Sequence, residues 1–262
     1  MQKKEILLFL WAGFFGALLS AACGRSGKNG SLSAPPLPSR SLSAIPFPVF
    51  LLPSAKVPLA GRAFSLDPAA GTALPGRPVT WKDLRVDCLF ARQGGSQWYL
   101  EPGAPVKFPR PGEVLLGLLS RPAAVSGVRG KVVYCAKTLL EVSPSPEGAS
   151  RAAPSSVTAE AGLPLEIVPL ADPAGLRPGD DCPIQTVFRG DPLAGAEIRV
   201  EGECRGWGNP ILLKTGPEGG ACFRLEGAGS WLITVCRVDV SSLEEPITWV
   251  SSLLFEVKGG KR

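Results

Sequence analysis

The chain has 262 residues, and its 28 Lys and Arg and 23 Asp and Glu give a formal net charge of +5. These charges are scattered, which excludes the basic stripe with interleaved aromatic residues that a nucleic-acid-binding protein would carry. The chain has no histidine, which excludes Ser-His-Asp and Cys-His nucleophiles and every histidine-based metal site. We therefore expect a protein that is not an enzyme.

Residues 1–22 predict an export signal. Lys3 and Lys4 form a basic start, an uncharged apolar stretch covers 6–19, and small residues follow at 20–22. Cys23 stands directly behind them, where a bacterial lipoprotein would be acylated. We expect a lipoprotein of the cell envelope or periplasm, held on the bacterial membrane through Cys23. A cleaved soluble protein and an uncleaved anchor are the alternatives.

Residues 23–44 are rich in Ser, Pro, Gly and basic residues, and the lack of apolar periodicity predicts a disordered tether. Structure is expected to begin near 45–52, where apolar residues and prolines interleave as in an edge strand. Alternation and apolar runs predict three further strands, at 84–90, 113–121 and 131–142. We interpret residues 45–142 as an N-terminal β-sandwich domain.

Residues 143–161 are rich in Ser, Pro and Ala and predict a linker or long exposed loop. Beyond it, seven short strands are predicted at 165–170, 182–188, 196–204, 211–215, 222–226, 231–238 and 247–258. This spacing is typical of an immunoglobulin-like or prealbumin-like sandwich, which makes residues 162–258 a second domain. The predicted fold class is all-β with two β-sandwich domains. We expect a buried core formed by Ile198, Val200, Phe223, Leu225, Trp231, Ile233, Trp249 and Phe255.

A turn is predicted at residues 190–192, where Gly, Asp and Pro follow one another. The strand after it alternates strictly between an apolar and a charged face, as a half-buried strand does. These two faces consist of Ile198, Val200 and Cys204 and of Glu197, Arg199, Glu201 and Glu203.

Cys23 aside, the mature chain carries six cysteines. In an oxidising envelope compartment an even set predicts disulfides. Because an even number falls in each predicted domain, we expect bridges between Cys88 and Cys135, Cys182 and Cys236, and Cys204 and Cys222. The four cysteines of the second domain allow three connectivities. Inert buried thiols and a structural metal site are the alternatives.

Several motifs follow one another between residues 132 and 257. They are Lys-Thr-Leu-Leu at 137–140, Gly-Leu-Pro-Leu-Glu-Ile-Val-Pro-Leu at 162–170, Pro-Gly-Asp at 178–180, Gly-Asp-Pro-Leu-Ala-Gly-Ala at 190–196, Lys-Thr-Gly at 214–216 and Gly-Ser-Trp-Leu at 229–232. This series resembles an uncharacterised family of bacterial envelope proteins, often labelled periplasmic components of nickel or cobalt uptake. The element Pro-Leu-Ala-Gly-Ala also resembles carboxypeptidase-regulatory-like sandwiches.

The resemblance implies an accessory role in handling a divalent metal or its complex, with a membrane transporter or another envelope protein as partner. Family members commonly begin with a His-containing segment ending in Trp-Leu-Glu-Pro, whereas this chain has Trp-Tyr-Leu-Glu-Pro without histidine at 98–102. Only oxygen or thiolate donors would remain to hold a divalent metal, and no metal ligand is assigned. The alternative is an Ig-like interaction or structural module of the cell envelope with no small ligand.

Overall fold

The computed structural model describes residues 47–55, 57–146, 152–153, 155–240 and 245–259. All of them belong to one unit, Ser41–Arg262. The export signal at 1–22, the lipidation site Cys23 and the tether at 23–44 lie outside the described residues and stay predictions. Within the described ranges, no helix is long and apolar enough to cross a membrane.

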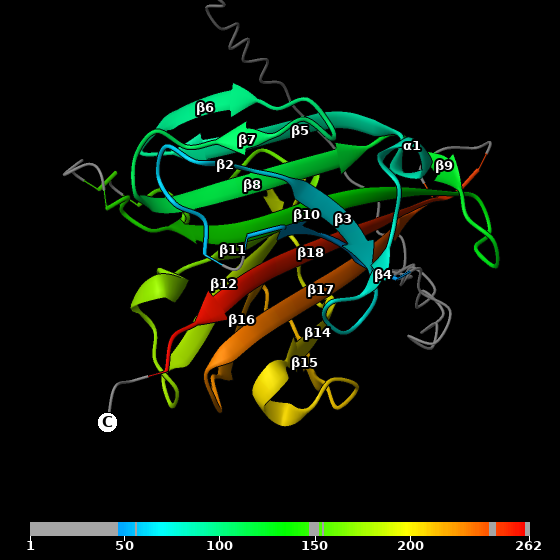
Figure 1. Cartoon of the computed structure of the whole chain (residues 1–262). Helices are drawn as coiled ribbons and strands as arrows, with labels where there is room; N and C mark the ends of the chain where they lie inside the picture. The colour runs from blue at the N-terminus through cyan, green and yellow to red at the C-terminus, as the bar shows by residue number, and fades with distance from the viewer. Residues whose placement is uncertain (1–46, 56, 147–151, 154, 241–244, 260–262) are drawn as a thin grey trace, which may run out of the picture. The chain divides into compact units, whose positions relative to one another are not determined.

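A nine-stranded sheet forms the centre of the fold (Figure 1). Its strands hydrogen-bond in the order β15-β14-β17-β18-β10-β8-β5-β6, and the short strand β9 pairs with β10. The apolar and β-branched residues of these segments favour an extended backbone. Their bounds are β5 Val86–Gln93, β6 Ser96–Tyr99, β8 Gly112–Ser120, β9 Ala123–Ala124, β10 Lys131–Val142, β14 Glu197–Gly202, β15 Ile211–Lys214, β17 Gly229–Asp239 and β18 Ile247–Val257.

Smaller sheets pack against this central sheet and confirm the prediction of an all-β sandwich. One consists of β1 Val49–Pro53, β3 Leu66–Ala70 and β4 Arg77–Pro78; a second of β11 Leu165–Pro169, β12 Asp181–Phe188, β13 Asp191–Pro192 and β16 Gly220–Arg224; a third of β2 Ala63–Phe64 and β7 Val106–Lys107. The helical elements of the described chain are short: α1 Trp81–Leu84, η2 Pro173–Gly175 and η3 Glu203–Arg205.

The strands on the two sides of the predicted linker share the central sheet. β10 from the N-terminal half pairs in parallel with β18 from the C-terminal half, in a register that runs from Lys131 opposite Ile247 to Thr138 opposite Leu254. A parallel pair requires a crossover connection, which here is the whole intervening chain. The boundary predicted at 143–161 is therefore not a break between two separate sheets.

Two large cores lie on opposite faces of the central sheet. On β8, Leu115 belongs to the core against the β11–β12 sheet, whereas its neighbours Val114 and Leu116 belong to the core under the N-terminal strands. This division follows the alternation of side chains along a strand. Two hydrogen bonds hold β1 against β10 on the face that carries the second core. Thr138 Oγ1 of β10 accepts from Leu51 N at 3.3 Å and donates to Leu51 O at 3.1 Å. β1 accordingly lies against both β10 and β18 and pairs with β3 (Figure 1).

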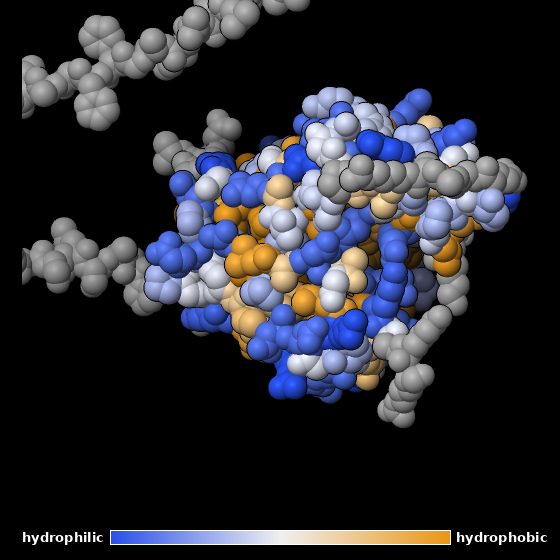
Figure 2. Space-filling model, turned by 90° about the vertical axis from the view of Figure 1, so that its left-hand side faces the viewer, coloured by the Kyte–Doolittle hydropathy of each residue, from blue (hydrophilic) through white to orange (hydrophobic). Residues whose placement is uncertain are grey.

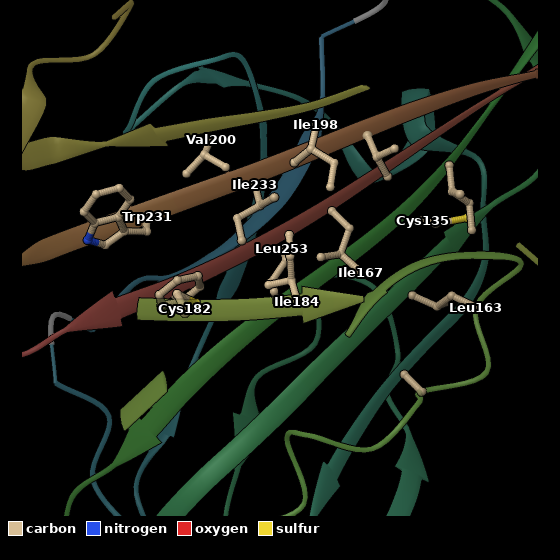
Figure 3. Close-up of a cluster of buried hydrophobic side chains, with 14 of the residues drawn as sticks. Cys135, Leu163, Ile167, Cys182, Ile184, Ile198, Val200, Trp231, Ile233 and Leu253 are labelled. Carbon is tan, nitrogen blue, oxygen red and sulfur yellow. The ribbon is translucent and has the colours of Figure 1, made fainter. Parts of the chain in front are cut away.

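The predicted core of the C-terminal half is confirmed. Seven of its eight residues are buried in one cluster, and Trp249 is partly buried against it. Figure 3 shows Trp231, Val200, Ile198 and Ile233 on the central sheet facing Ile184 and Ile167 of the second sheet. These contacts remove a large apolar area from water, which is the main favourable term in folding.

Three local predictions differ from the structure. Val157, in the predicted linker, is 1% exposed and packs into the same core, so part of that segment covers the central sheet. Cys204 does not continue the apolar face of β14, because the chain turns into η3 at Glu203. The turn after β12 falls at Arg189 and Gly190, both with positive φ, which is the two-residue hairpin loop that suits the twist of paired strands.

A buried ion pair joins the two sheets. Lys137 of β10 donates from Nζ to Glu166 Oε1 at 2.7 Å and to the Ile167 carbonyl at 2.9 Å, and both charged side chains are fully buried. The Glu166 carboxylate also accepts from the backbone N–H groups of residues 161, 162 and 163 at 2.6 to 3.2 Å. Burial lowers the pKa of Lys137, and Glu166 acts in the opposite direction. The pair thus holds β10, β11 and the chain before β11 in one arrangement.

Candidate functional site

A cleft of about 700 Å³ lies on the face of the central sheet opposite the β11–β12 sheet. Its walls come from β1, β3 and β4, from the chain around β9 and from α1, and its floor from β14 and β17. This volume falls in the range of ligand-binding pockets. Its polar lining consists of Thr72, Arg77, Asp83, Ser120, Ser126, Tyr134, Glu197, Arg199, Thr234 and Cys236.

The floor of the cleft is positioned by strand pairing. Arg199 of β14 lies directly opposite Thr234 of β17, and both point away from the core that contains Ile198 and Val235. Arg199 is held in place by Glu201, whose Oε1 accepts from Nε at 3.1 Å and from Nη2 at 2.5 Å. Glu201 is 2% exposed, and burial raises its pKa while Arg199 acts in the opposite direction. Arg199 is thus a fixed cationic group at the floor of the cleft.

The hydroxyl and thiol groups of the cleft are neutral near pH 7. Burial raises the pKa of Tyr134, and the neighbouring Cys236 raises it further. Burial also raises the pKa of Cys236 to about 12. Because a thiol needs its thiolate form to attack or to bind a metal, Cys236 is poorly suited to either task. These groups are suited to hydrogen bonding and packing against a ligand.

The cleft carries balanced charge and open strand edges. Arg77 and Arg199 supply positive charge, and Asp83 and Glu197 supply negative charge. Among the described strands, β4 ends its three-stranded sheet and β9 pairs with β10 on one side. Such edges present backbone N–H and C=O groups that an added strand can use. The cleft can therefore take an extended segment that carries charges of both signs.

The opposite end of the molecule is a weaker candidate. Figure 2 shows the left-hand side of Figure 1, where apolar residues gather near the centre of the face and hydrophilic residues surround them. Apolar atoms contribute much of the surface of most folded proteins, so this exposure alone does not indicate a site. The cleft remains the candidate site because it combines hollow shape with convergent polar groups.

The six described cysteines are free thiols, so none of the three predicted pairs is bonded. Cys88 and Cys135 lie on β5 and β10, and both are paired with Leu119 of the strand between them. Two strand spacings amount to about 10 Å, beyond the reach of a disulfide. Cys182 faces the core, as Figure 3 shows. Cys236 belongs to the other face of the central sheet, because it alternates with Val235.

The third predicted pair is also separate. Cys204 lies in η3 at the end of β14, and Cys222 lies on β16 in the other sheet, where both are exposed. The even number of cysteines in each half of the chain therefore does not indicate disulfide bonds. On β16 the exposed Cys222 is followed by the buried Phe223 on the other face of the strand.

The burial of the thiols predicts a graded reaction with iodoacetamide. At pH 8 we expect Cys204 and Cys222 to react first, Cys88 and Cys236 to react slowly, and Cys135 and Cys182 to react only after unfolding. The Cys135 and Cys182 side chains are buried, so the reagent reaches them only after unfolding. Cys88 and Cys236 are partly exposed, but burial raises the pKa of both thiols, so little thiolate forms at that pH. Peptide mass spectrometry after timed labelling measures the order. Equal protection of two cysteines that is lost on reduction would reveal a disulfide and contradict the free-thiol arrangement.

Metal ligands do not converge in the described part of the chain, which contains no group of three or more Cys, Asp or Glu residues arranged to hold a metal ion. Glu113 of β8 and Asp172 before η2 are hydrogen-bonded to each other. Burial and this hydrogen bond raise the pKa of Glu113 to about 7. Although burial opposes it, the hydrogen bonds from Glu113 and Ser155 lower the pKa of Asp172. The pair therefore shares a proton below about pH 7 and belongs to no group of three or more such residues in the described part of the chain.

The sequence predicted which side chains of β14 face the cleft, but it did not predict the segments that form the walls of the cleft. The alternation of strand 196–204 placed Glu197 and Arg199 on the face away from the core, which the structure confirms. It could not show that β1, β3, β4 and the chain near β9 form walls around that face. β4 and β9 are two-residue strands, too short to give a periodic signal.

Comparison with known proteins adds a family and little more. The family described as "Domain of unknown function (DUF4198)" matches residues 86–239. No curated protein matches the sequence. A solved structure titled "Three N-terminal domains of the bacteriophage RB49 Highly Immunogenic Outer Capsid protein (Hoc)" is similar at a TM-score of 0.23 and 9% identity. The match covers 80% of this chain and 59% of that chain, which is less than two thirds of that chain's length.

Proposed function

The chain belongs to the DUF4198 family, a domain family of unknown function, and on this premise we propose that it is a non-catalytic binding protein of the cell envelope whose cleft takes an extended, mixed-charge segment of a partner protein. The observation that carries the proposal is the cleft itself, in which apolar walls, charges of both signs and two short edge strands converge. Main-chain hydrogen bonds to such edges supply affinity, and the flanking side chains supply specificity.

The proposed absence of catalysis rests on chemistry. The chain has no histidine to act as a general base. The thiol and phenol groups in the cleft have raised pKa values, so they are protonated at pH 7. A nucleophile without an adjacent base or a lowered pKa is weak. Binding without reaction therefore suits these groups best.

The proposed location follows from the N-terminal sequence. The basic start, apolar stretch and small residues before Cys23 favour export and lipid attachment. The described residues begin at Phe47, so the 23 residues 24–46 separate Cys23 from the described part of the chain. Replacing Cys23 by Ser is expected to release the protein from membranes, and full retention would exclude acylation as the anchor.

Cross-linking from within the cleft tests the binding function. A photoreactive p-benzoylphenylalanine replaces Ser126 in the cleft or Tyr99, which is 76% exposed on the edge strand β6. We expect a defined adduct with a partner from position 126 and not from position 99. Mass spectrometry of the adduct should identify an extended segment with charges of both signs.

A pair of matched variants ties the adduct to the cleft. Ala124→Trp places a bulky ring in the cleft and should abolish the adduct from position 126, whereas Ala194→Trp, at an exposed turn elsewhere, should leave it unchanged. The same adducts from both positions, or an adduct that survives Ala124→Trp, would reject the cleft as the binding surface.

Handling of nickel or cobalt is the second candidate, and it rests on the resemblance of residues 132–257. Donors for these ions would have to be carboxylates such as Glu113 and Asp172, since the thiols have raised pKa values. Calorimetry of the mature protein against nickel, cobalt, zinc and calcium distinguishes the two roles. Metal handling requires binding tighter than about 10 μM, or about 7 kcal/mol. If none of the four metals produces a binding signal, metal handling is rejected and partner binding remains the proposed function.

A further inference from the structure

Unsatisfied polar atoms gather at one end of the space between the central sheet and the β11–β12 sheet. Five buried side-chain atoms of the described residues have no hydrogen-bond partner. Four of them come from three strands that meet there: Thr186 Oγ1 of β12, Arg237 Nε of β17, and Trp249 Nε1 and Ser251 Oγ of β18. Unpartnered buried groups are rare in native proteins, so four in one region call for an explanation.

Strand register places these groups on facing surfaces. Arg237 lies directly opposite Trp249, and Ser251 lies directly opposite the core residue Val235. The alternation of β17 and β18 therefore turns all three side chains toward the β11–β12 sheet. Thr186 precedes Phe188 by two residues on β12, so both side chains are on the face of β12 that is turned toward the central sheet. The Phe188 ring centroid lies 5.8 Å from that of Trp249 and 4.4 Å from Arg237 Cζ.

The chemistry of the four atoms indicates an acceptor. Arg237 Nε and Trp249 Nε1 can only donate hydrogen bonds, and the two hydroxyls can donate as well as accept. Thr186 and Ser251 are both fully buried, so bulk solvent does not satisfy them. A group with several lone pairs would satisfy such a set of donors.

The local charge favours an anion. Arg189 and Arg237 both lie against the Phe188 ring, with Cζ atoms 4.8 and 4.4 Å from its centroid. Asp239 pairs with Arg189 through a 2.9 Å contact to Nη2. Two guanidinium groups and one carboxylate leave one positive charge, which matches a monoanion. Guanidinium groups bind planar carboxylates through paired N–H donors, which makes a carboxylate a better match than a spherical halide.

We propose that this end of the space between the sheets is a binding site for a small carboxylate, which accepts hydrogen bonds from Arg237, Trp249, Ser251 and Thr186. The donor atoms are closed off from solvent, so a side chain must move to admit the ligand. Arg189 is the gate, because its side chain is 55% exposed and its Cζ lies 5.8 Å from the Trp249 ring centroid. This site lies on the other face of the central sheet from the cleft.

Indole N–H signals in ¹⁵N NMR spectra test the site directly. The signal of Trp249 is assigned by its loss in Trp249→Phe, and the protein is titrated with sodium acetate or sodium chloride at constant ionic strength and pH 7. We expect acetate, and not chloride, to shift the Trp249 signal in a saturable manner, while the Trp98 signal stays in place. Formate should act like acetate.

Matched variants separate binding from general effects. Arg237→Gln should weaken acetate binding at least about ten-fold, and Arg224→Gln, on the exposed face of β16, should not change it. Ser251→Ala keeps every charge and should also weaken binding, so the test survives if Arg237→Gln does not fold. A Trp249 signal unmoved by every carboxylate would overturn the proposal. So would cross-peaks to water from the Trp249 indole that persist unchanged in acetate, because internal water would then satisfy these donors.

Discussion

Replacing Lys137 by Met is expected to lower the free energy of unfolding by about 3–5 kcal/mol, because the substitution leaves the Glu166 carboxylate buried without its cation. Both side chains are fully buried, and Nζ lies 2.7 Å from Oε1. Urea denaturation at pH 7 measures the loss.

Lys131→Met is the matched control on the same strand. Lys131 pairs with Glu245 at 3.4 Å, and both side chains are more than half exposed. Exposed ion pairs contribute about 0–1 kcal/mol, so this variant should lose little stability. Equal losses for the two lysines would mean that the buried pair does not hold β10 and β11 together.

Replacing Trp231 by Ala should cost about 3–5 kcal/mol, because it leaves a cavity in the centre of the larger core. Trp231 is fully buried, and its ring centroid lies 5.7 Å from that of Phe223 on the opposing sheet. Its Nε1 donates to the Gly227 carbonyl at 3.2 Å. A Cβ at Gly202, directly across the β14–β17 pair, would lie 2.9 Å from the ring, so the site is tightly filled.

Tyr99→Ala provides the comparison for Trp231→Ala. Tyr99 is 76% exposed on the edge strand β6, so its truncation should change stability by no more than about 0.5 kcal/mol. Both variants are measured by urea denaturation, with the slope against urea recorded as a check on compactness. A loss below about 1 kcal/mol for Trp231→Ala would contradict the packing shown in Figure 3.

Sequence patterns predicted strands far better than strand partners. β10 runs from Lys131 to Val142, the bounds that alternation and apolar runs predicted. The alternation of apolar and polar residues predicts which side chains share a face of a strand, but it does not predict which strand lies next to it. The parallel pairing of β10 with β18 joins residues more than 100 positions apart. The sequence predicted two sandwich domains, whereas in the structure two large cores lie on the two faces of one sheet.

Charged residues show the same limit. Lys137 and Glu166 fall within two of the motifs that carry the family resemblance, yet Lys and Glu are almost never fully buried without a partner. Their partnership depends on β11 packing over β10, which no local pattern reveals. The disulfide prediction was based on the number of cysteines in each predicted domain, whereas disulfide formation depends on the distances between the strands that carry them. The cleft depends on walls from two-residue strands that carry no periodicity.

Both proposed sites contain residues of β17, a strand of the shared sheet. β17 contributes Thr234 and Cys236 to the cleft on one face and Arg237 to the proposed carboxylate site on the other. The family match at 86–239 likewise runs across the predicted boundary at 143–161. Both observations agree with one folding unit that needs strands from each half.

Unfolding of the separate segments 45–142 and 162–258 tests this shared sheet most directly. Each segment would lose the β10–β18 pairing, and the second would also lose the core residues Phe90, Leu115 and Val133. We expect a single cooperative urea transition for the whole unit 41–262 and no cooperative transition for either segment alone. Sharp transitions from both isolated segments, with stabilities that add up to that of the whole unit, would contradict the shared sheet and show two independent domains.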